Sequence, residues 1–328
     1  MRMDGDQMES KFMKILNSFK SKKILVIGDI MLDKYIWGDV SRISPEAPVQ
    51  IVNAVNETYA PGGASNVANN ISALSGKAYM IGIVGNDDAR TILINDLKSK
   101  SINTDGIIID NDKPTIQKIR IMGRGQQLLR VDYEKKEHVH KKIELQIKDF
   151  ISLKIKDTDV VVISDYAKGV ITKEIAEHIV KLAIKHNKPL IVDPKPAHRE
   201  FYRGATLITP NNAEASEMSG IDDGSDESSS KIGKKLLKDM GTNVLLTRGE
   251  KGMSLFEKNG NTTNIPAKAK EVYSLTGAGD TVVATAALAL ASGATMKEAA
   301  YLANIAAGIK VGKIGTATVT LEEIKKEL

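Results

Sequence analysis

Residues 22–30 read KKILVIGDI, a compact apolar run that ends in Gly-Asp. Such a run is typical of a strand buried on both faces of a parallel sheet. Similar runs recur along the chain: AYMIGIVG (78–85), DVVVIS (159–164), KPLIVDP (188–194), ATLITP (205–210) and NVLLTRG (243–249). Helical patterns lie between them, over residues 63–75, 87–100, 172–187, 227–240, 277–292 and 296–311. This alternation predicts an α/β fold with a doubly wound, mostly parallel sheet flanked by helices.

Two segments interrupt the alternation. Residues 33–55 and 107–134 are extended, half-polar and broken by turns. We expect them to form a small β-sheet beside the main one, as a lid. The lid segments, at about 34–55 and 107–133, would be inserted into a single domain that covers residues 1–328.

The composition excludes several classes of function. Of the 328 residues 42% are hydrophobic but only 4% are aromatic, so Ile, Val, Leu and Ala must fill the core. The net charge of +5 is mild and spread along the chain, which argues against a nucleic-acid partner. The lack of cysteine excludes disulfides and thiolate metal sites and favours a reducing compartment. Because there is neither a secretory signal nor an apolar run of roughly 18 residues, we expect a cytoplasmic protein without a membrane partner.

The stretch SLTGAGDTVVATAALAL (274–290) places Gly277, Ala278 and Gly279 before Asp280 at the start of an apolar helix. The first N–H groups of a helix lack partners within it, and the helix dipole adds partial positive charge there. Small residues let a phosphoryl group approach these N–H groups, so we predict an anion hole. Asp280 would lie within reach of an attacking hydroxyl and could accept its proton. The alternative is that Asp280 only caps the helix and the glycines only make a tight turn.

A second pair of glycines opens the helix expected in YAPGGASNVANNISALS (59–75). Gly62 and Gly63 would let a ligand approach the backbone. Asn66 lies one turn into the helix and offers both a donor and an acceptor to sugar hydroxyls. The alternative is a helix that packs closely through its small residues.

Two further polar stretches follow expected strands. Asp33 ends GDIMLD (28–33) at the carboxyl edge of the sheet, where open α/β sheets bind ligands, although it could also be a turn residue. In TPNNAE (209–214), Asn211 and Glu214 share one face of a helix start. They could bind Mg²⁺ through water, or they could form an ordinary capping box.

Two common nucleotide signatures are missing. There is no G-x-x-x-x-G-K-[ST], so the chain is not expected to be a P-loop enzyme. The first strand is not followed by G-x-G-x-x-G, which argues against an NAD-type site.

Together these stretches resemble the signatures of the ribokinase-like sugar kinases, the PfkB family. GGASNVANNISALSG resembles the first signature and LTGAGDTVVATAALAL the second, with TPNNAE as the N-x-x-E motif between them. Within that family, GDIMLDKYIWGDVSRISPEAPVQIV, QQLLRVDYE, SDYAKGV, IVDPK and GTATVT resemble kinases that act on heptose 7-phosphate. Because no H-x-G-H motif is present, we expect a stand-alone kinase without a nucleotidyltransferase domain.

The resemblance implies a reaction and its site. ATP would phosphorylate the anomeric hydroxyl of D-glycero-β-D-manno-heptose 7-phosphate to the 1,7-bisphosphate, for ADP-heptose synthesis. Asp280 would be the base, and Gly277, Ala278 and Gly279 the anion hole. The resemblance implies ATP and Mg²⁺ as cofactors, leaves a monovalent cation open as a further one, and implies a homodimer formed through the lids. The implied nucleotide residues are Asn211, Glu214, Thr247, Gly249, Gly252, Asn304 and Gly308, with Asn211 and Glu214 also nearest the metal. The implied substrate residues are Asp33, Gly62, Gly63, Asn66 and Asp165.

A sugar phosphate also needs cations. TIQKIRIMGRGQQLLR (115–130) offers Lys118, Arg120, Arg124 and Arg130, and alternation along a strand places Lys118 and Arg120 on one face. Arginine can hold a phosphate with two parallel hydrogen bonds. The alternative is a solvated basic edge strand. Arg124-Gly125 departs from the His-Asn that we associate with this motif, so it could add a cation or change the turn.

Two rival functions remain. One is a kinase of the same fold that acts on another sugar, sugar phosphate or nucleoside. The other is a non-catalytic sugar-phosphate sensor, which the retained Asp280 and glycines disfavour. ATP turnover would separate the sensor from the kinases.

Overall fold

The computed structural model describes residues 5–268, 273–313, 315 and 317–328. Its larger sheet has the strand order β13-β12-β11-β10-β9-β8-β1-β4-β5. The strands are β1 (Lys23–Gly28), β4 (Lys77–Val84), β5 (Asn103–Ile109), β8 (Val160–Ser164), β9 (Leu190–Asp193), β10 (Leu207–Ile208), β11 (Asn243–Thr247), β12 (Met253–Phe256) and β13 (Thr262–Ile265). The run from β11 to β5 is parallel, and β12 and β13 extend one edge in antiparallel fashion. The sheet is therefore mostly parallel, as the alternating pattern predicts.

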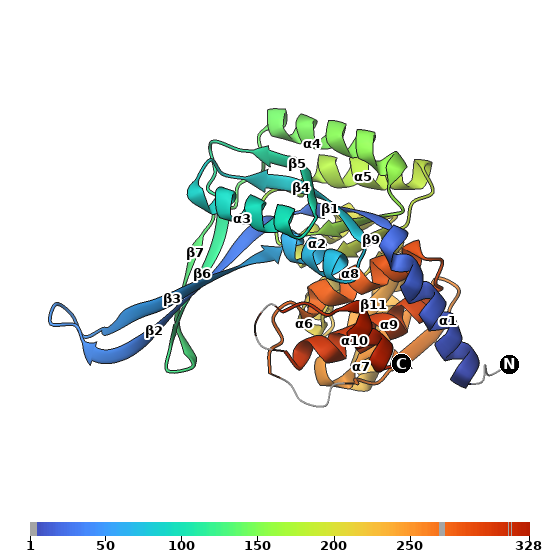
Figure 1. Cartoon of the computed structure of the whole chain (residues 1–328). Coiled ribbons are helices and arrows are strands. Elements are labelled where there is room, and N and C mark those ends of the chain that lie inside the picture. Colours follow the sequence, from blue (N-terminus) through green and yellow to red (C-terminus); the bar gives the residue numbers. More distant parts are fainter. Residues whose placement is uncertain (1–4, 269–272, 314, 316) are drawn as a thin grey trace.

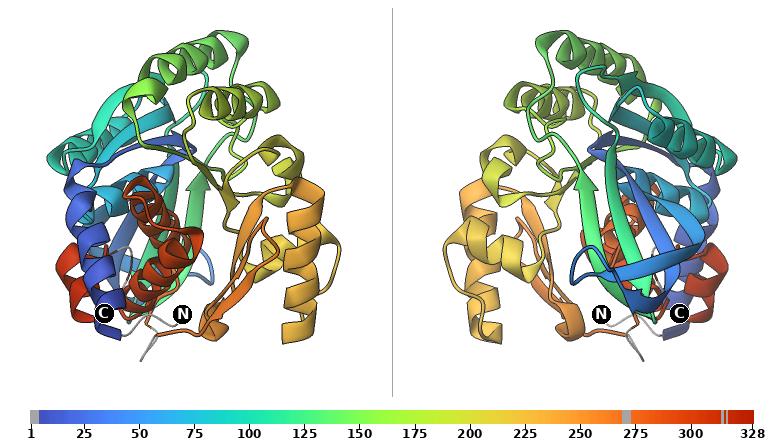
Figure 2. Two further views of the ribbon diagram at one scale, coloured as in Figure 1. Left: turned by 90° about the vertical axis from the view of Figure 1, so that its right-hand side faces the viewer. Right: turned by 90° about the vertical axis from the view of Figure 1, so that its left-hand side faces the viewer.

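Helices cover both faces of this sheet (Figures 1 and 2). One layer contains α1 (Gly5–Ser18), α2 (Ala64–Ala73), α3 (Asp88–Ser99), α8 (Ala278–Ala291), α9 (Met296–Val311) and α10 (Leu321–Lys326). The other contains α4 (Lys141–Lys154), α5 (Lys173–Lys185), α6 (Asn212–Ser219) and α7 (Asp226–Met240). Short 3₁₀ turns are η1 (Phe19–Ser21), η2 (Ile155–Asp157), η3 (Pro196–Tyr202) and η4 (Gly249–Lys251). Alternate residues of β1 enter the two cores: Ile24 and Val26 face one, Leu25 and Ile27 the other.

A smaller sheet, called the lid sheet below, projects from the body at the left of Figure 1. Its order is β3-β2-β6-β7, from β2 (Ile30–Ile43), β3 (Gln50–Gly63), β6 (Ile116–Gly123) and β7 (Gln126–Tyr133). β2 pairs antiparallel with β3 and parallel with β6, and β6 forms a hairpin with β7. The first residues of β2 are buried and its far half is largely exposed, so this strand connects the core to the lid sheet.

The structure corrects the expected lid boundaries. Residues 107–109 belong to β5, which pairs with β4 at the edge of the larger sheet rather than with the lid. In the other segment, β3 runs on to Gly63, beyond the expected limit at residue 55. In both cases the boundary of the lid lies at a break in the chain. The polar turn before Ile116 separates β5 from the lid strand β6, and the glycine pair before α2 ends the lid strand β3.

Arg124 and Gly125 form the turn of the β6–β7 hairpin. Both residues have positive φ, +51° and +76°. This is typical of the two-residue primed turns whose twist suits a hairpin. The Arg124 guanidinium donates to the Val40 carbonyl, 2.8 Å away, so it fastens the turn to β2.

Two observations complete the fold. In the described part of the chain no helix combines the length and the apolar character needed to cross a membrane. Thr316 of the GTATVT stretch lies outside the described residues.

Candidate active site

The N-terminus of α8 lies at the centre of the candidate site. Gly277 precedes the helix with φ +78°, and a Cβ there would lie 2.9 Å from the Asn66 amide nitrogen, so glycine is required on both counts. A Cβ on Gly279 would meet no atom within 4 Å, which leaves open space in front of the helix start. The following turns are buried on all sides, from Asp280 to Ala289. An open helix N-terminus on a buried helix fits the predicted anion hole.

Asp280 is buried, with 6% of its surface exposed. Its carboxylate accepts a hydrogen bond from the Asn66 amide at 2.6 Å and another from the Tyr166 hydroxyl at 2.9 Å. Burial, together with a smaller effect of the nearby Asp33, raises the pKa of Asp280 to about 6 against the lowering effect of these two donors. Asn66 was expected to contact the sugar, and the structure brings it to the expected base.

Tyr166 was not anticipated, and the loop that carries it is built around Asp29. The buried Asp29 carboxylate accepts hydrogen bonds from the backbone N–H groups of Tyr166, Lys168 and Val170 at 2.9–3.1 Å. Burial raises the pKa of Asp29 to about 6, with Asp165 as the next cause. The sequence offers no signal for these contacts, because they join residues more than a hundred positions apart.

Asp33 lies where β2 leaves the body and is 5% exposed. Its carboxylate accepts a hydrogen bond from the Arg120 guanidinium at 2.6 Å. A Cβ on Gly62 would come within 2.6 Å of the same carboxylate, so glycine leaves room for it. Gly63, with φ +56°, leads the chain from β3 into α2. The structure thus brings together Asp33, the glycine pair and Arg120.

Three of the four expected lid cations, Lys118, Arg120 and Arg130, share one face of the lid sheet. Lys118 lies beside Asp33 and Asp132 in register, and Arg120 beside Tyr35 and Arg130. Asp132 accepts from Arg130 at 2.9 Å and lies 3.5 Å from the Lys118 ammonium. These three cations are therefore paired with carboxylates, and a phosphate would have to exchange with these partners.

A cavity of about 800 Å³ opens from the α8 N-terminus toward α9. It is lined by eight of the predicted residues: Asn211, Thr247, Gly249, Gly252, Ala278, Gly279, Asn304 and Gly308. Apolar side chains, among them Met253, Val282 and Val311, also line it. This mixture of an apolar wall and a few polar groups is usual for small-molecule sites.

Asn211 and Glu214 form the capping box that was the alternative to a metal site. The Asn211 side chain accepts from the Glu214 N–H at 2.9 Å, and the Glu214 carboxylate accepts from the Asn211 N–H at 3.1 Å. The second Glu214 oxygen accepts from Lys195 at 2.5 Å. Across the described ranges no three acidic, His or Cys side chains converge as a metal site. The capping box is therefore confirmed, and binding of a hydrated Mg²⁺ by Asn211 and Glu214 stays a prediction.

Asp165 has a different environment from the one expected of a substrate contact. It is 1% exposed and accepts hydrogen bonds from the Ala167 N–H and the Tyr202 hydroxyl, both at 2.7 Å. Its carboxylate also lies 2.7 Å from the His198 ring nitrogen. These partners favour a role in shaping the Tyr166 loop, and a contact of Asp165 with substrate stays a prediction.

The arrangement joins a proton acceptor to a phosphate-sized space. Asp280 has a pKa close enough to neutral to hold and release a proton, and it follows the open helix N-terminus that ends the cavity. Asp33, which is paired with Arg120, lies close enough to Asp280 to raise its pKa. A nucleotide in the cavity and a polyhydroxyl acceptor at the lid sheet would meet at this carboxylate.

Comparisons with known proteins agree with this geometry. A model of the pfkB family carbohydrate kinase matches residues 21–324. Proteins of Desulfatibacillum aliphaticivorans and Geobacter sulfurreducens, both named Bifunctional protein HldE, are 43% and 44% identical over 94% and 92% of this chain. The chain spans only 64% and 61% of their lengths.

Solved structures match across the same span. A ribokinase from Arabidopsis thaliana, complexed with ribose and ATP, has a TM-score of 0.74 at 21% identity, covering 93% of this chain and 97% of that one. Phosphofructokinase-2 from Escherichia coli, in complex with potassium, has a TM-score of 0.76 at 19% identity, with the same coverage. The fold is therefore ribokinase-like. With a family model that matches nearly all of its length, the chain belongs to the pfkB family of carbohydrate kinases, which are phosphotransferases with an alcohol group as acceptor.

Proposed function

We propose that this protein phosphorylates the anomeric hydroxyl of D-glycero-β-D-manno-heptose 7-phosphate with MgATP, giving the 1,7-bisphosphate for ADP-heptose synthesis. The observation that supports a kinase reaction is the buried Asp280 carboxylate at the open N-terminus of α8, where the large cavity ends. The heptose assignment rests on the sequence stretches that resemble heptose 7-phosphate kinases and on the relatives named HldE.

In the proposed mechanism the N–H groups at the start of α8 stabilise charge on the transferring phosphoryl group. Asp280 orients the acceptor hydroxyl and takes its proton as the oxygen attacks phosphorus in line with the leaving ADP. Asn66 and Tyr166 hold the carboxylate in place for this step. Asn211 and Glu214 would hold the hydrated Mg²⁺, which supplies charge neutralisation on the ATP phosphates.

The phosphate of the substrate would be bound by the lid cations. Lys118 and Arg120 lie on the face of the lid sheet that also carries Asp33, and their carboxylate partners would give way to the sugar and its phosphate. Closure of the lid would exclude water, which otherwise competes with the sugar for ATP.

One observation favours a second candidate, an unphosphorylated sugar as acceptor. Arg120 is paired with Asp33, and Lys118 and Arg130 with Asp132, so these lid cations already have anionic partners. If Lys118, Arg120 and Arg130 keep these partners, none of the three is available to a substrate phosphate.

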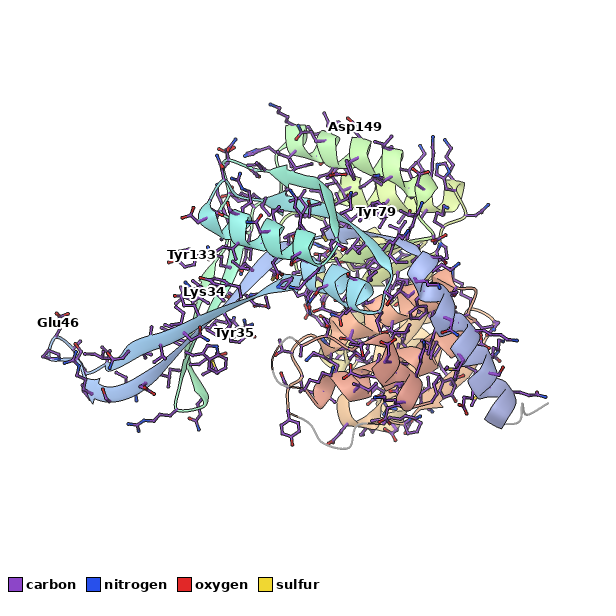
Figure 3. The ribbon with its side chains drawn as sticks, in the orientation of Figure 1. Lys34, Tyr35, Glu46, Tyr79, Tyr133 and Asp149 are labelled. Carbon is purple, nitrogen blue, oxygen red and sulfur yellow. The ribbon has the colours of Figure 1, made fainter. Side chains whose placement is uncertain are left out.

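We also propose a homodimer formed through the other face of the lid sheet. That face carries the exposed apolar side chains Tyr59, Leu129, Val131 and Tyr133. Lys34 and Tyr35, labelled in Figure 3, are neighbours on β2 and so belong to opposite faces of the lid sheet, whereas Glu46 lies at its tip. Exposed apolar surface of this kind is typical of an interaction face.

The test is a phosphorus NMR assay with MgATP and an acceptor panel: both anomers of heptose 7-phosphate, fructose 6-phosphate, fructose 1-phosphate, ribose and no sugar. A new anomeric phosphate only with the heptose supports the proposal. Turnover with another acceptor keeps the kinase mechanism and refutes the heptose assignment. Absence of ADP with every acceptor argues for the sensor function instead. Replacing potassium by choline in the same assay tests whether a monovalent cation contributes.

A further inference from the structure

Lys195 lies beyond the carboxyl end of β9 and touches two groups of the candidate site. Its ammonium donates to Glu214 at 2.5 Å, and it lies 5.6 Å from the centre of the Tyr166 ring. Its side chain is 32% exposed, so it can be reached by a ligand. The sequence predicts neither contact, since there Lys195 is only the last residue of the stretch IVDPK.

These two contacts connect opposite walls of the phosphate end of the cavity. Glu214 directly follows Ala213, which lines the cavity from α6. Tyr166 donates its hydroxyl hydrogen bond to Asp280, which directly follows Gly279 on the α8 side. Lys195 therefore lies between the α6 wall of the cavity and Asp280. The terminal phosphate of a bound nucleotide must lie in the same region if it is to be transferred to a hydroxyl beside Asp280.

The acidic side chains in this region favour the presence of a cation when an anionic nucleotide binds. Asp193, at the end of β9, has a pKa raised well above its usual value by burial, then by Asp280 and by Glu214, and Lys195 opposes these effects. Asp280 and Glu214 thus lie close enough to Asp193 for their negative charges to act on it. Like charges repel each other more strongly in a partly buried site than in water, so these acidic groups would disfavour an anionic nucleotide unless a cation accompanied it.

Lys310, the other cation near Asp280, is less available for this task. It is only 1% exposed, and its ammonium donates to the Gly315 carbonyl at 2.7 Å. It contributes to the field at Asp280 from within the core. Lys195 is the more accessible of the two and has a carboxylate partner that it can release.

We propose that Lys195 is a further catalytic residue, whose ammonium leaves Glu214 when MgATP binds and donates to the oxygens of the transferring phosphoryl group. This inference rests on the kinase reaction proposed above. In that reaction the acceptor oxygen bonds to the γ-phosphorus as the bond to the β,γ-bridging oxygen breaks. ADP leaves with the electron pair, and the hydroxyl proton goes to Asp280. Lys195 keeps its own protons and supplies charge only, as cationic clamps do in other phosphoryl transfers.

The experiment compares nucleotide binding with and without a terminal phosphate. Titration calorimetry would measure the affinities of the wild type, Lys195→Met and Lys195→Arg for MgADP and for Mg-AMP-PCP, whose methylene bridge prevents transfer. Lys195→Met should bind ADP within about twofold of wild type but lose about 10- to 100-fold of its affinity for AMP-PCP, as expected for one charge-assisted hydrogen bond. Lys195→Arg should recover part of that loss because it keeps the charge. Lys188→Met is the matched control and should change neither affinity, because this half-buried lysine lies before the opposite end of β9 and donates to the Lys156 carbonyl.

Kinetics supply the second readout. With an acceptor that the wild type phosphorylates, Lys195→Met should lower kcat by about 100-fold or more while changing the KM for the sugar little. An equal loss of ADP and AMP-PCP affinity would show that Lys195 only positions Glu214 and would overturn the proposal, as would an unchanged kcat. The binding measurements need no acceptor, so they test Lys195 even if the heptose assignment fails.

Discussion

At the scale of single residues, Asp280 combines two requirements that oppose each other. A proton acceptor must be ionised at neutral pH, and burial disfavours the ionised form. The Asn66 amide and the Tyr166 hydroxyl offset part of that cost, and the pKa settles at about 6. The site therefore holds a carboxylate that is mostly ionised at pH 7 and still basic enough to accept a proton from a sugar hydroxyl.

Removing the charge of Asp280 should lower the activity of the protein and raise its stability. Asp280→Asn is expected to lower kcat by at least about 100-fold, the usual effect of losing a general base, with nearly unchanged ATP binding. The folded protein binds a proton on Asp280 more tightly than the unfolded chain does, since burial raises the pKa from its usual 3.8 to about 6. The ionised carboxyl thus destabilises the fold above pH 6 by up to about 3 kcal/mol.

The Asn variant should consequently have a higher Tm than wild type at pH 7.5, and the difference should vanish below pH 4. Calorimetry over this pH range measures it. Asp149→Asn on the exposed side of α4 is the control and should change neither kcat nor Tm. Wild-type turnover in Asp280→Asn would refute the role of the carboxylate.

The pH profile tests the two hydrogen-bond donors. For the wild type, kcat/KM for the acceptor should fall as the pH drops below about 6, because Asp280 becomes protonated. Asn66→Ala and Tyr166→Phe each remove a donor that lowers the pKa, so the acidic limb should move to higher pH in both. A limb that stays in place in both variants would mean that another group controls the profile.

At the scale of elements, the start of α8 depends on one residue without a side chain. Gly277 and Gly293, at the two ends of the helix, have nearly the same backbone conformation, with φ of +78° and +83°. A Cβ would approach Asn66 at the first position and nothing within 4 Å at the second. The pair therefore separates backbone strain from crowding of the site.

Gly277→Ala and Gly293→Ala should each destabilise the fold by about 1–2 kcal/mol, the cost of a left-handed conformation for alanine. Only Gly277→Ala should also lower kcat, by displacing Asn66 from Asp280. Denaturant unfolding and steady-state kinetics on both variants measure the two effects. Equal kcat values would show that the approach to Asn66 does not matter for the reaction.

Elements of the parallel sheet could be predicted because their physical constraint is visible locally. A strand covered on both faces is a short apolar run, and β1, β4, β8, β9 and β11 all show it. Ile143, Ile147 and Ile151 in α4 show helical spacing, so this helix is also visible in the sequence. The end of β5 was assigned to the wrong sheet, because a local sequence pattern does not show which strand it pairs with.

The candidate site could be predicted only in part, because a local sequence pattern does not show which distant residues come together. The glycine turns, Asp280 and the N-x-x-E residues show their chemistry in short stretches. Tyr166 and Lys195 join the site through contacts with Asp280 and Glu214, 114 and 19 positions away. No spacing rule covers such contacts, and only the folded arrangement of the carboxyl ends of β8 and β9 reveals them.

At the scale of the whole molecule, the lid sheet has two unlike faces. One carries Asp33 and the cations, and the other carries exposed apolar side chains such as Leu129, of which 56% is exposed. The proposed dimer would cover the apolar face and leave the polar one to the substrate.

Leu129→Asp should therefore convert the dimer to a monomer, because a charge would be buried at the interface. Leu153→Asp changes a leucine that is even more exposed, at 67%, on helix α4 and should leave the dimer intact. Sedimentation velocity at several concentrations distinguishes the two. A wild type that sediments as a monomer would exclude the dimer, and a dimeric Leu129→Asp would exclude this face as the contact.

The complete burial of α8 has one more consequence, for the exchange of its amide hydrogens with deuterium. Residues 280–289 are buried throughout, so their amides should exchange only when the entire molecule unfolds. The amides near Glu46, at the tip of the lid sheet, should exchange within seconds to minutes. The half of the site that α8 contributes should thus be formed before any ligand binds. Nucleotide and sugar together should then slow amide exchange only in the half that the lid sheet contributes.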